Sequence, residues 1–301
     1  MDPAPVSRVL ALPRPAEPTR RRALWLSRLV RRRATVIGLV LLTITAVIGA
    51  LAPVIAGDPL RMEVSARLTA PGAAHWFGTD DVGRDVWSRV VYGARLSLLV
   101  GAAVVLLAFA VGLVCGLAAG YWRRLDNPVM RVMDGLMAFP AIILAIALMA
   151  SLGPSVINVI VAIGVVYAPR VARIVRGSVL VIRETAYVEA ARALGVPDLV
   201  IVARHVLPNC LSPVIVQGSF VFAAAVLTEA ALSFLGVGVP PYVPSWGNIL
   251  AEGRLYLQQA PWLVLYPGAA IMLTIFGLNL LGDGLRDLLD PRLRGLVRER
   301  S

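Results

Sequence analysis

One charged stretch interrupts the long apolar runs of this 301-residue chain, and it reads Glu189-Ala-Ala-Arg-Ala-Leu-Gly195-Val-Pro-Asp-Leu-Val-Ile-Val-Ala-Arg-His205-Val-Leu-Pro208-Asn209. Its first part is rich in alanine and straight-chain residues, which favour helix. Gly195 is placed to end that helix, because glycine adopts the left-handed conformation at little cost. Pro197 suits the first position of a second helix, and Pro208 is expected to stop it. The stretch therefore predicts two short helices joined at a glycine, outside the bilayer.

The rest of the chain has the composition of a membrane protein, with 58% hydrophobic residues and a mean hydropathy of +0.78. Soluble domains rarely carry so much apolar sequence. Five uncharged runs approach or exceed the roughly 20 residues that cross a bilayer as a helix. They are Ala34–Gly57, Leu96–Trp122, Gly135–Pro169, Cys210–Thr228 and Leu255–Gly282. Gly153-Pro154 breaks the third run into two spans. The sequence thus predicts an all-α, polytopic membrane protein with six transmembrane helices.

The arginines predict how these spans are oriented. All 29 basic residues are arginine, and 23 of them lie in segments that are inside if the N-terminus is inside. The positive-inside rule then places both termini and the Glu189 loop (residues 185–208) in the cytoplasm. The net charge of +11 reflects this topology and attraction to anionic membrane lipid. Nucleic-acid binding is not expected, because the arginines are spread over separate loops.

The predicted organisation has five parts, defined by charge and hydropathy. They are a cytoplasmic Pro/Arg-rich segment (1–33), the first transmembrane helix (34–57), an outer loop with an interfacial helix (58–95), a core with five transmembrane helices and the Glu189 loop (96–283), and a cytoplasmic tail (284–301).

Several strings resemble one protein family. Glu189-Ala-Ala, Gly195 six residues later, and Leu207-Pro208 beyond it resemble the EAA loop of ABC importer permeases. The residues at the end of this stretch, His205-Val-Leu-Pro-Asn209, resemble those of the peptide/nickel branch of that family. Other strings agree with the branch in order and spacing: His75–Arg95, Met130–Pro140, Thr228–Gly238, Pro244–Asn248 and Asn279–Arg292. The resemblance covers roughly residues 70–295.

This resemblance implies a role for the Glu189 loop and a set of partners. In the family the loop is a cytoplasmic coupling helix, between spans four and five, that docks into a cleft of the ATPase subunit. The matching positions are Glu189, Ala190, Ala191, Leu194, Gly195, Leu207 and Pro208. The implied partners are a second homologous permease, two ATP-binding subunits or domains and an extracytoplasmic substrate-binding protein, in a bacterial inner membrane. Di- and oligopeptides, including glutathione-like peptides, are the leading substrates, and nickel is the alternative.

Other function classes are less consistent with the sequence. A P-loop needs a lysine, and this chain has none, so another polypeptide must hydrolyse any ATP. We therefore expect a non-catalytic subunit without a cofactor. An intramembrane enzyme is not favoured, because His-Glu-x-x-His and Gly-x-Ser-x-Gly are absent and His75 and His205 fall on opposite sides of the membrane. A secondary transporter would place ionisable residues near the bilayer midplane, and only Glu229 comes close.

Two residues of the spans are candidates for the pathway or a gate. Glu229 is an ionisable residue near a membrane span, which makes it a functional candidate by default. Pro140 can bend span three and leave a backbone carbonyl free.

The first outer loop contains four possible metal ligands, His75, Asp80, Asp81 and Asp85. There is only one imidazole among them, and the carboxylates alternate with arginines that can pair with them, Arg84, Arg89 and Arg95. We therefore assign no metal site here. Asp80 or Asp81 is expected to cap a helix that starts at about Val82.

Small residues and cysteines complete the sequence features. Gly112, Gly116 and Gly120 repeat at every fourth position, so another helix can approach closely, either within this chain or across a subunit interface. Cys115 and Cys210 are expected at different depths and are not predicted to form a disulfide.

Overall fold

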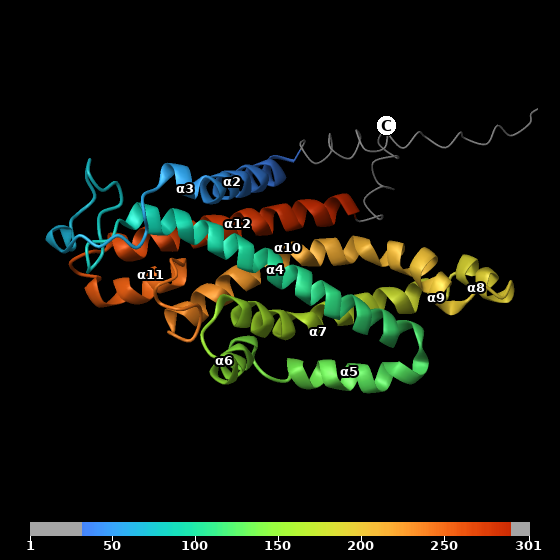
Figure 1. Ribbon diagram of the computed structural model, residues 1–301. Coiled ribbons are helices and arrows are strands. Elements are labelled where there is room, and N and C mark those ends of the chain that lie inside the picture. Colours follow the sequence, from blue (N-terminus) through green and yellow to red (C-terminus); the bar gives the residue numbers. More distant parts are fainter. Residues whose placement is uncertain (1–31, 290–301) are drawn as a thin grey trace, which may run out of the picture.

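The computed structural model describes residues 32–289, so most of the N-terminal segment and most of the C-terminal tail lie outside the described residues. The described chain is a bundle of long helices with short elements at its two ends (Figure 1). The elements are α2 (Arg33–Ala50), α3 (Ala52–Ile55), η1 (Val64–Ala66), α4 (Val86–Tyr121), α5 (Arg123–Met137), α6 (Ala141–Leu152), α7 (Val156–Ile182), α8 (Ala186–Ala193), α9 (Asp198–Ile201), η2 (Val202–Val206), α10 (Leu207–Phe234), α11 (Trp246–Gly253), η3 (Arg254–Tyr256) and α12 (Trp262–Leu289). Over these residues the only strand-like feature is an isolated bridge between Thr79 and Asp85. The predicted all-α fold is confirmed.

Five helical segments are long and apolar enough to cross a membrane: α2, α4, α7, the run from α9 through α10, and α12. The remaining predicted span corresponds to α5 and α6 together, which meet at an angle of 92°. The expected bend at Pro140 is therefore a complete break. Pro140 has an extended ψ of 132° and stands at the N-cap of α6, and proline disfavours helical conformation in the residue before it.

The centre of the bundle is the contact between α4 and α7. A Cβ at Gly112 would lie 2.5 Å from the Cβ of Val171, and one at Gly120 would lie 2.6 Å from the Cβ of Val179. Between them, a Cβ at Gly116 would lie 2.6 Å from the carbonyl oxygen of Ala172. Only glycine leaves room for this approach. The glycine stripe is thus used for packing within the chain.

The outer loop, which contains η1, leads directly into α4. Asp85 caps α4, because its carboxylate accepts a hydrogen bond from the backbone N–H of Ser88 at 2.8 Å. The prediction that Asp80 or Asp81 caps this helix is wrong. Asp80 instead accepts hydrogen bonds from the backbone N–H groups of Val82 and Arg84, which closes a turn before the helix begins.

A buried ionic network joins this turn to α11. The Asp80 carboxylate, which is fully buried, lies 2.6 Å from Arg84 Nε and 2.6 Å from Arg89 Nη1. Both arginines also pair with Glu252 at the end of α11, with Arg84 Nη2 at 2.8 Å and Arg89 Nη2 at 3.0 Å. The expected pairing of arginines with carboxylates in this loop is confirmed for Asp80. Glu252 adds a partner from the other end of the sequence.

We predict opposite effects for two glycine-to-alanine changes in the α4–α7 pair. Gly116→Ala should destabilise the protein by about 1–3 kcal/mol, because the added Cβ clashes with the backbone of α7. Gly177→Ala should stabilise it by about 0.4–1 kcal/mol, because no atom lies within 4 Å of the new Cβ and the unfolded chain loses freedom. Thermal unfolding in one detergent would measure both. Equal shifts of the midpoint would contradict the packing assignment.

The ionic network makes a second prediction. Arg89→Met should cost about 3–5 kcal/mol, because it removes one partner of buried carboxylates. The matched control is Arg61→Met, since Arg61 is 74% exposed and pairs with Glu63 at the surface, and it should cost about 1 kcal/mol or less. Limited proteolysis of residues 58–85 together with thermal unfolding would check this. Equal resistance of the two variants to proteolysis and to thermal unfolding would show that the ionic network does not hold the outer loop.

Candidate functional site

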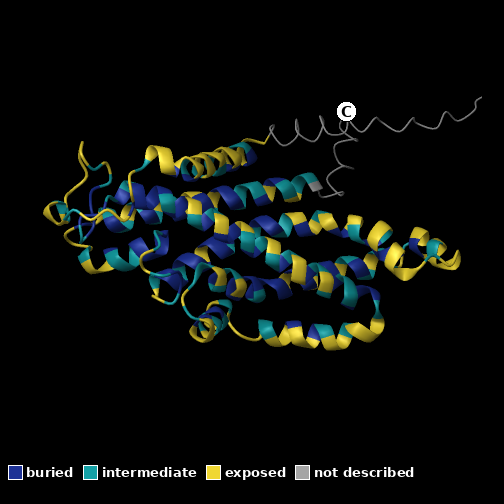
Figure 2. Cartoon of the chain, in the orientation of Figure 1, coloured by how far each residue is buried: buried dark blue, intermediate teal, exposed yellow. Residues whose placement is uncertain are grey.

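The Glu189 loop forms one end of the molecule, and the outer loop and α11 form the opposite end (Figure 1). α8 and α9 extend beyond the ends of the neighbouring long helices, and much of their surface is exposed (Figure 2). Val188 of α8 and Ile201 of α9 are fully buried and belong to the main hydrophobic cluster of the bundle. These two side chains attach an otherwise exposed loop to the core.

Gly195 ends α8 as predicted. Its φ is +76°, a conformation that glycine adopts without strain. The N–H of Gly195 donates to the carbonyl of Arg192, and the N–H of Val196 donates to the carbonyl of Ala191. This pair of bonds is a Schellman motif. It turns the chain sharply, so that Pro197 and Asp198 begin α9 beside α8.

Pro208 does not stop the second helix, so that prediction is wrong. A π turn over Val202–Val206 joins α9 to α10, and Leu207 N–H closes it by donating to the carbonyl of Val202. Pro208 then lies in the first turn of α10, where its missing N–H costs little. The side-chain nitrogen of Asn209 donates a hydrogen bond to the backbone carbonyl of His205 at 2.7 Å.

The structure brings the two halves of the predicted site to the same end of the molecule. The side-chain nitrogen of Asn209, next to Pro208, lies 3.4 Å from the hydroxyl of Tyr187 on α8. Glu189, Ala190, Leu194, Gly195 and Pro208 are exposed, and Ala191 and Leu207 are half-buried. These exposed positions are available to a partner.

Four large apolar side chains are exposed at this end of the molecule. Leu194 is 83% exposed and Leu199 is 70% exposed, and Tyr187 and Val200 are also exposed. We call these four residues the apolar tip. Exposed apolar groups rimmed by polar residues mark interaction sites. The loop also carries the charged residues Glu189 and Arg192 on α8. The arrangement suits docking to another protein.

Contacts to the end of α4 hold the loop in place, and the sequence interpretation did not identify them. The Tyr121 hydroxyl donates to the Asp198 carboxylate at 2.6 Å. The guanidinium carbon of Arg192 lies 5.7 Å from the centre of the Tyr121 ring, within the range of a cation–π contact. Arg183, just after α7, donates to the carbonyl of Gly120 at 2.8 Å. These partners are far apart in sequence, so spacing alone gives no signal for them.

The other two predicted site residues lie elsewhere in the fold. Glu229 is fully buried on α10, and its carboxylate accepts hydrogen bonds from Ser97 on α4 at 3.2 Å and from Ser233 at 2.9 Å. Glu229 thus joins α10 to α4 near the α11 end. Pro140 is exposed at the break between α5 and α6. The structure does not bring Glu229 and Pro140 to the Glu189 loop.

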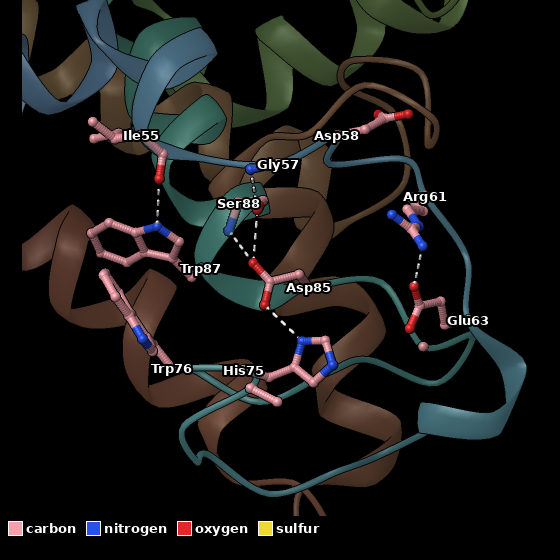
Figure 3. A pocket seen from close by; sticks show the side chains of 12 residues that line it. Ile55, Gly57, Asp58, Arg61, Glu63, His75, Trp76, Asp85, Trp87 and Ser88 are labelled. Carbon is pink, nitrogen blue, oxygen red and sulfur yellow. Dashed lines mark hydrogen bonds and ion pairs between the residues drawn. The ribbon is translucent and has the colours of Figure 1, made fainter.

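A cavity of about 350 Å³ opens at the opposite end, where the outer loop meets the start of α4 (Figure 3). His75 Nδ1 lies 3.1 Å from the Asp85 carboxylate, which also accepts from the Ser88 hydroxyl. Trp76 and Trp87 pack against each other with ring centres 5.4 Å apart. The cavity therefore combines an aromatic wall with hydrogen-bonded polar groups.

The four possible metal ligands of the outer loop do not converge. His75 contacts Asp85, whereas Asp80 belongs to the arginine network. Oxygens of Asp80, Asp81 and Glu252 lie within 4.8 Å of one another. Two of these carboxylates are neutralised by Arg84 and Arg89, which leaves little charge to attract a cation.

Comparisons with known proteins agree with this geometry. Residues 108–295 match the family model described as "Binding-protein-dependent transport system inner membrane component". A putative peptide transport system permease protein of Brucella suis biovar 1 is 54% identical over 89% of this chain and 90% of its own length. The dipeptide transport system permease protein DppC of Alkalihalophilus pseudofirmus is 45% identical over 88% of each chain. The glutathione transport system permease protein GsiD of Pectobacterium atrosepticum is 44% identical over 74% of this chain and 75% of its own.

A solved structure shows the same fold. The match is to an inward-facing structure of the MetNI methionine ABC transporter, with a TM-score of 0.56 and 21% identity, covering 67% of this chain and 96% of that one. The apolar helices and the family description together place the protein in the inner membrane as a multi-pass subunit. The chain belongs to the family of inner-membrane permease components of binding-protein-dependent ABC transport systems.

Proposed function

We propose that this permease moves di- or oligopeptides across the membrane, and that the Glu189 loop receives the force from separate ATP-hydrolysing subunits. The observation that carries the proposal is the form of the loop. Val188 and Ile201 are buried in the bundle, whereas Leu194, 83% exposed, stands at the apolar tip. Such a loop can bind a partner through its exposed apolar tip and transmit the partner's movement to the helices through its buried side chains.

The proposed topology places the apolar tip in the cytoplasm. The arginine distribution supports this orientation. Docking of α8 in a cleft of an ATPase subunit would bury the apolar tip and the exposed part of the EAA motif, Glu189, Ala190, Leu194 and Gly195. Closure of the ATPases would then favour one arrangement of the helices through its differential contacts with the loop.

The partners follow from the family. They are a second homologous permease, two ATP-binding subunits or domains, and a substrate-binding protein at the α11 end. Large apolar side chains of α2 and α6 are exposed in the isolated chain, where both helices carry many exposed residues (Figure 2), and they have room for lipid and for the second permease. Glu229 and Pro140 are proposed to act on the pathway or its gate. Glu229 would do so by tying α10 to α4 through Ser97.

Peptides are the proposed substrate class because the relatives carry peptide, dipeptide and glutathione names. Nickel is less favoured, since those relatives are named for peptides and the chain has only two histidines. The chain itself contributes no group for hydrolysing ATP in this proposal, so it needs no cofactor.

The substrate class is tested by uptake. Cells that lack this gene should lose ATP-dependent uptake of labelled di- or oligopeptides and keep uptake of labelled nickel. Restoring the gene should restore peptide uptake. Loss of nickel uptake with normal peptide uptake would reverse the assignment.

The docking role is tested at the apolar tip. Leu194→Asp should weaken capture of the ATPase subunits and lower peptide uptake at least tenfold, since a charge replaces an apolar group that docking buries. The protein should insert and unfold normally, because Leu194 is exposed. The matched control is Leu255→Asp, a 73% exposed leucine at the opposite end, which should leave ATPase capture unchanged. Unimpaired ATPase capture by the Leu194 variant would rule out docking through the tip.

A further inference from the structure

The last turn of α4 contacts both short helices of the Glu189 loop and the residue that follows α7. Its Tyr121 reaches α9 through the 2.6 Å hydrogen bond to Asp198, and it reaches α8 through the guanidinium of Arg192. The preceding residue, Gly120, accepts the bond from Arg183 at the end of α7. The Glu189 loop connects α7 to α10 in the sequence, but it is also supported by α4, to which it is not directly connected.

The ring and the hydroxyl of Tyr121 have separable roles. The ring is buried and belongs to the same hydrophobic cluster as Val188 and Ile201. The hydroxyl donates a hydrogen bond to the charged carboxylate of Asp198, and such bonds are stronger than neutral ones; it also faces the side chain of Arg192. Phenylalanine would keep the ring packing and remove the hydroxyl, and with it the bond to Asp198 and the polar contact with Arg192.

α4 connects this contact to the other end of the molecule. It has 36 residues, which gives a length of about 54 Å. Its first turns carry Asp85 and Arg89, which hold the outer loop and α11. Along its second half the glycine stripe presses it against α7. A displacement of its last turn is therefore passed along one continuous, tightly packed helix.

We propose that Tyr121 is a positioning residue for coupling: its hydroxyl joins the Glu189 loop to α4, so that loop movement is transmitted to α4. The inference rests on the proposed ATPase-docking function of that loop. Without the bond, α8 and α9 would still be attached through Val188 and Ile201 and through their chain connections to α7 and α10, but they would move with less effect on α4.

The experiment compares Tyr121→Phe with the unaltered full-chain permease, assembled with its ATPase and permease partners in liposomes. Amide hydrogen exchange over residues 186–201 should rise about tenfold, the factor expected from losing one hydrogen bond to a charged acceptor. ATP hydrolysis should stay within about twofold of the unaltered complex, whereas peptide transported per ATP should fall by about threefold or more.

Three further variants separate coupling from general stability. Tyr167→Phe removes a tyrosine hydroxyl bond elsewhere in the bundle, the bond between Tyr167 and the neutral Thr228 hydroxyl at 3.0 Å between α7 and α10, and should leave the ratio of transport to hydrolysis unchanged. Asp198→Asn keeps an acceptor for Tyr121 and should retain most of the coupling. Asp198→Ala should match Tyr121→Phe, and the double variant should be no worse than either single one.

The outcomes distinguish this inference from the proposed function. If the unaltered complex hydrolyses ATP but moves no peptide, the substrate assignment fails, and the exchange results with the double-variant comparison still decide the role of Tyr121. If Tyr121→Phe leaves exchange of α8 and α9 unchanged, the inference is wrong. A normal ratio of transport to hydrolysis in an otherwise active complex, or additive effects of the Tyr121 and Asp198 changes, would also overturn it.

Discussion

The close approach of α4 to α7 is the constraint on which the rest of the bundle depends. Three glycines of α4 face Val171, Ala172, Val175 and Val179, so at these positions α4 places no side chain between the two backbones. Two helices in such contact can slide or rotate past each other only by clashing, because packed interiors deform little. The pair is therefore best regarded as one body. α10 packs on both of its members, and the Glu189 loop leaves from one end of α7 and returns through α10 to the same bundle.

The two ends of this body are built from different chemistry. At the α11 end, Asp80 and Glu252 are held by two arginines in a largely buried, charge-balanced network. Separating such groups leaves a buried charge without a partner, so this end resists partial opening. At the other end the loop is attached by small apolar contacts and by the bond from Tyr121 to Asp198. An attachment of that kind can yield and re-form at moderate cost, which suits the end that we propose receives a moving partner.

The membrane class, the helical spans and the two short helices joined at Gly195 could be predicted from the sequence, because these follow from local features. Apolar runs of membrane length, Gly195 at a helix end and the EAA string are each visible within a short window. The sequence interpretation was wrong where a single residue was read alone. Pro208 lies within a longer helical run, since a π turn precedes it, and Asp85 caps α4 although Asp80 and Asp81 are also good capping residues. It could not find Tyr121 or Glu252, because their partners are more than 70 residues away and no periodicity links them.

The π turn before α10 also determines which way the loop faces. In a helix each residue advances the chain by about 100° around the axis, and a π turn holds one residue more than the α-helical turn it replaces. Removing one residue from Val202–Val206 would restore a regular helix and rotate α9 against α10 by roughly that angle. α8, connected through Gly195, would follow. The angular register of the apolar tip is thus encoded by the length of a five-residue segment, and not by the residues of the tip itself.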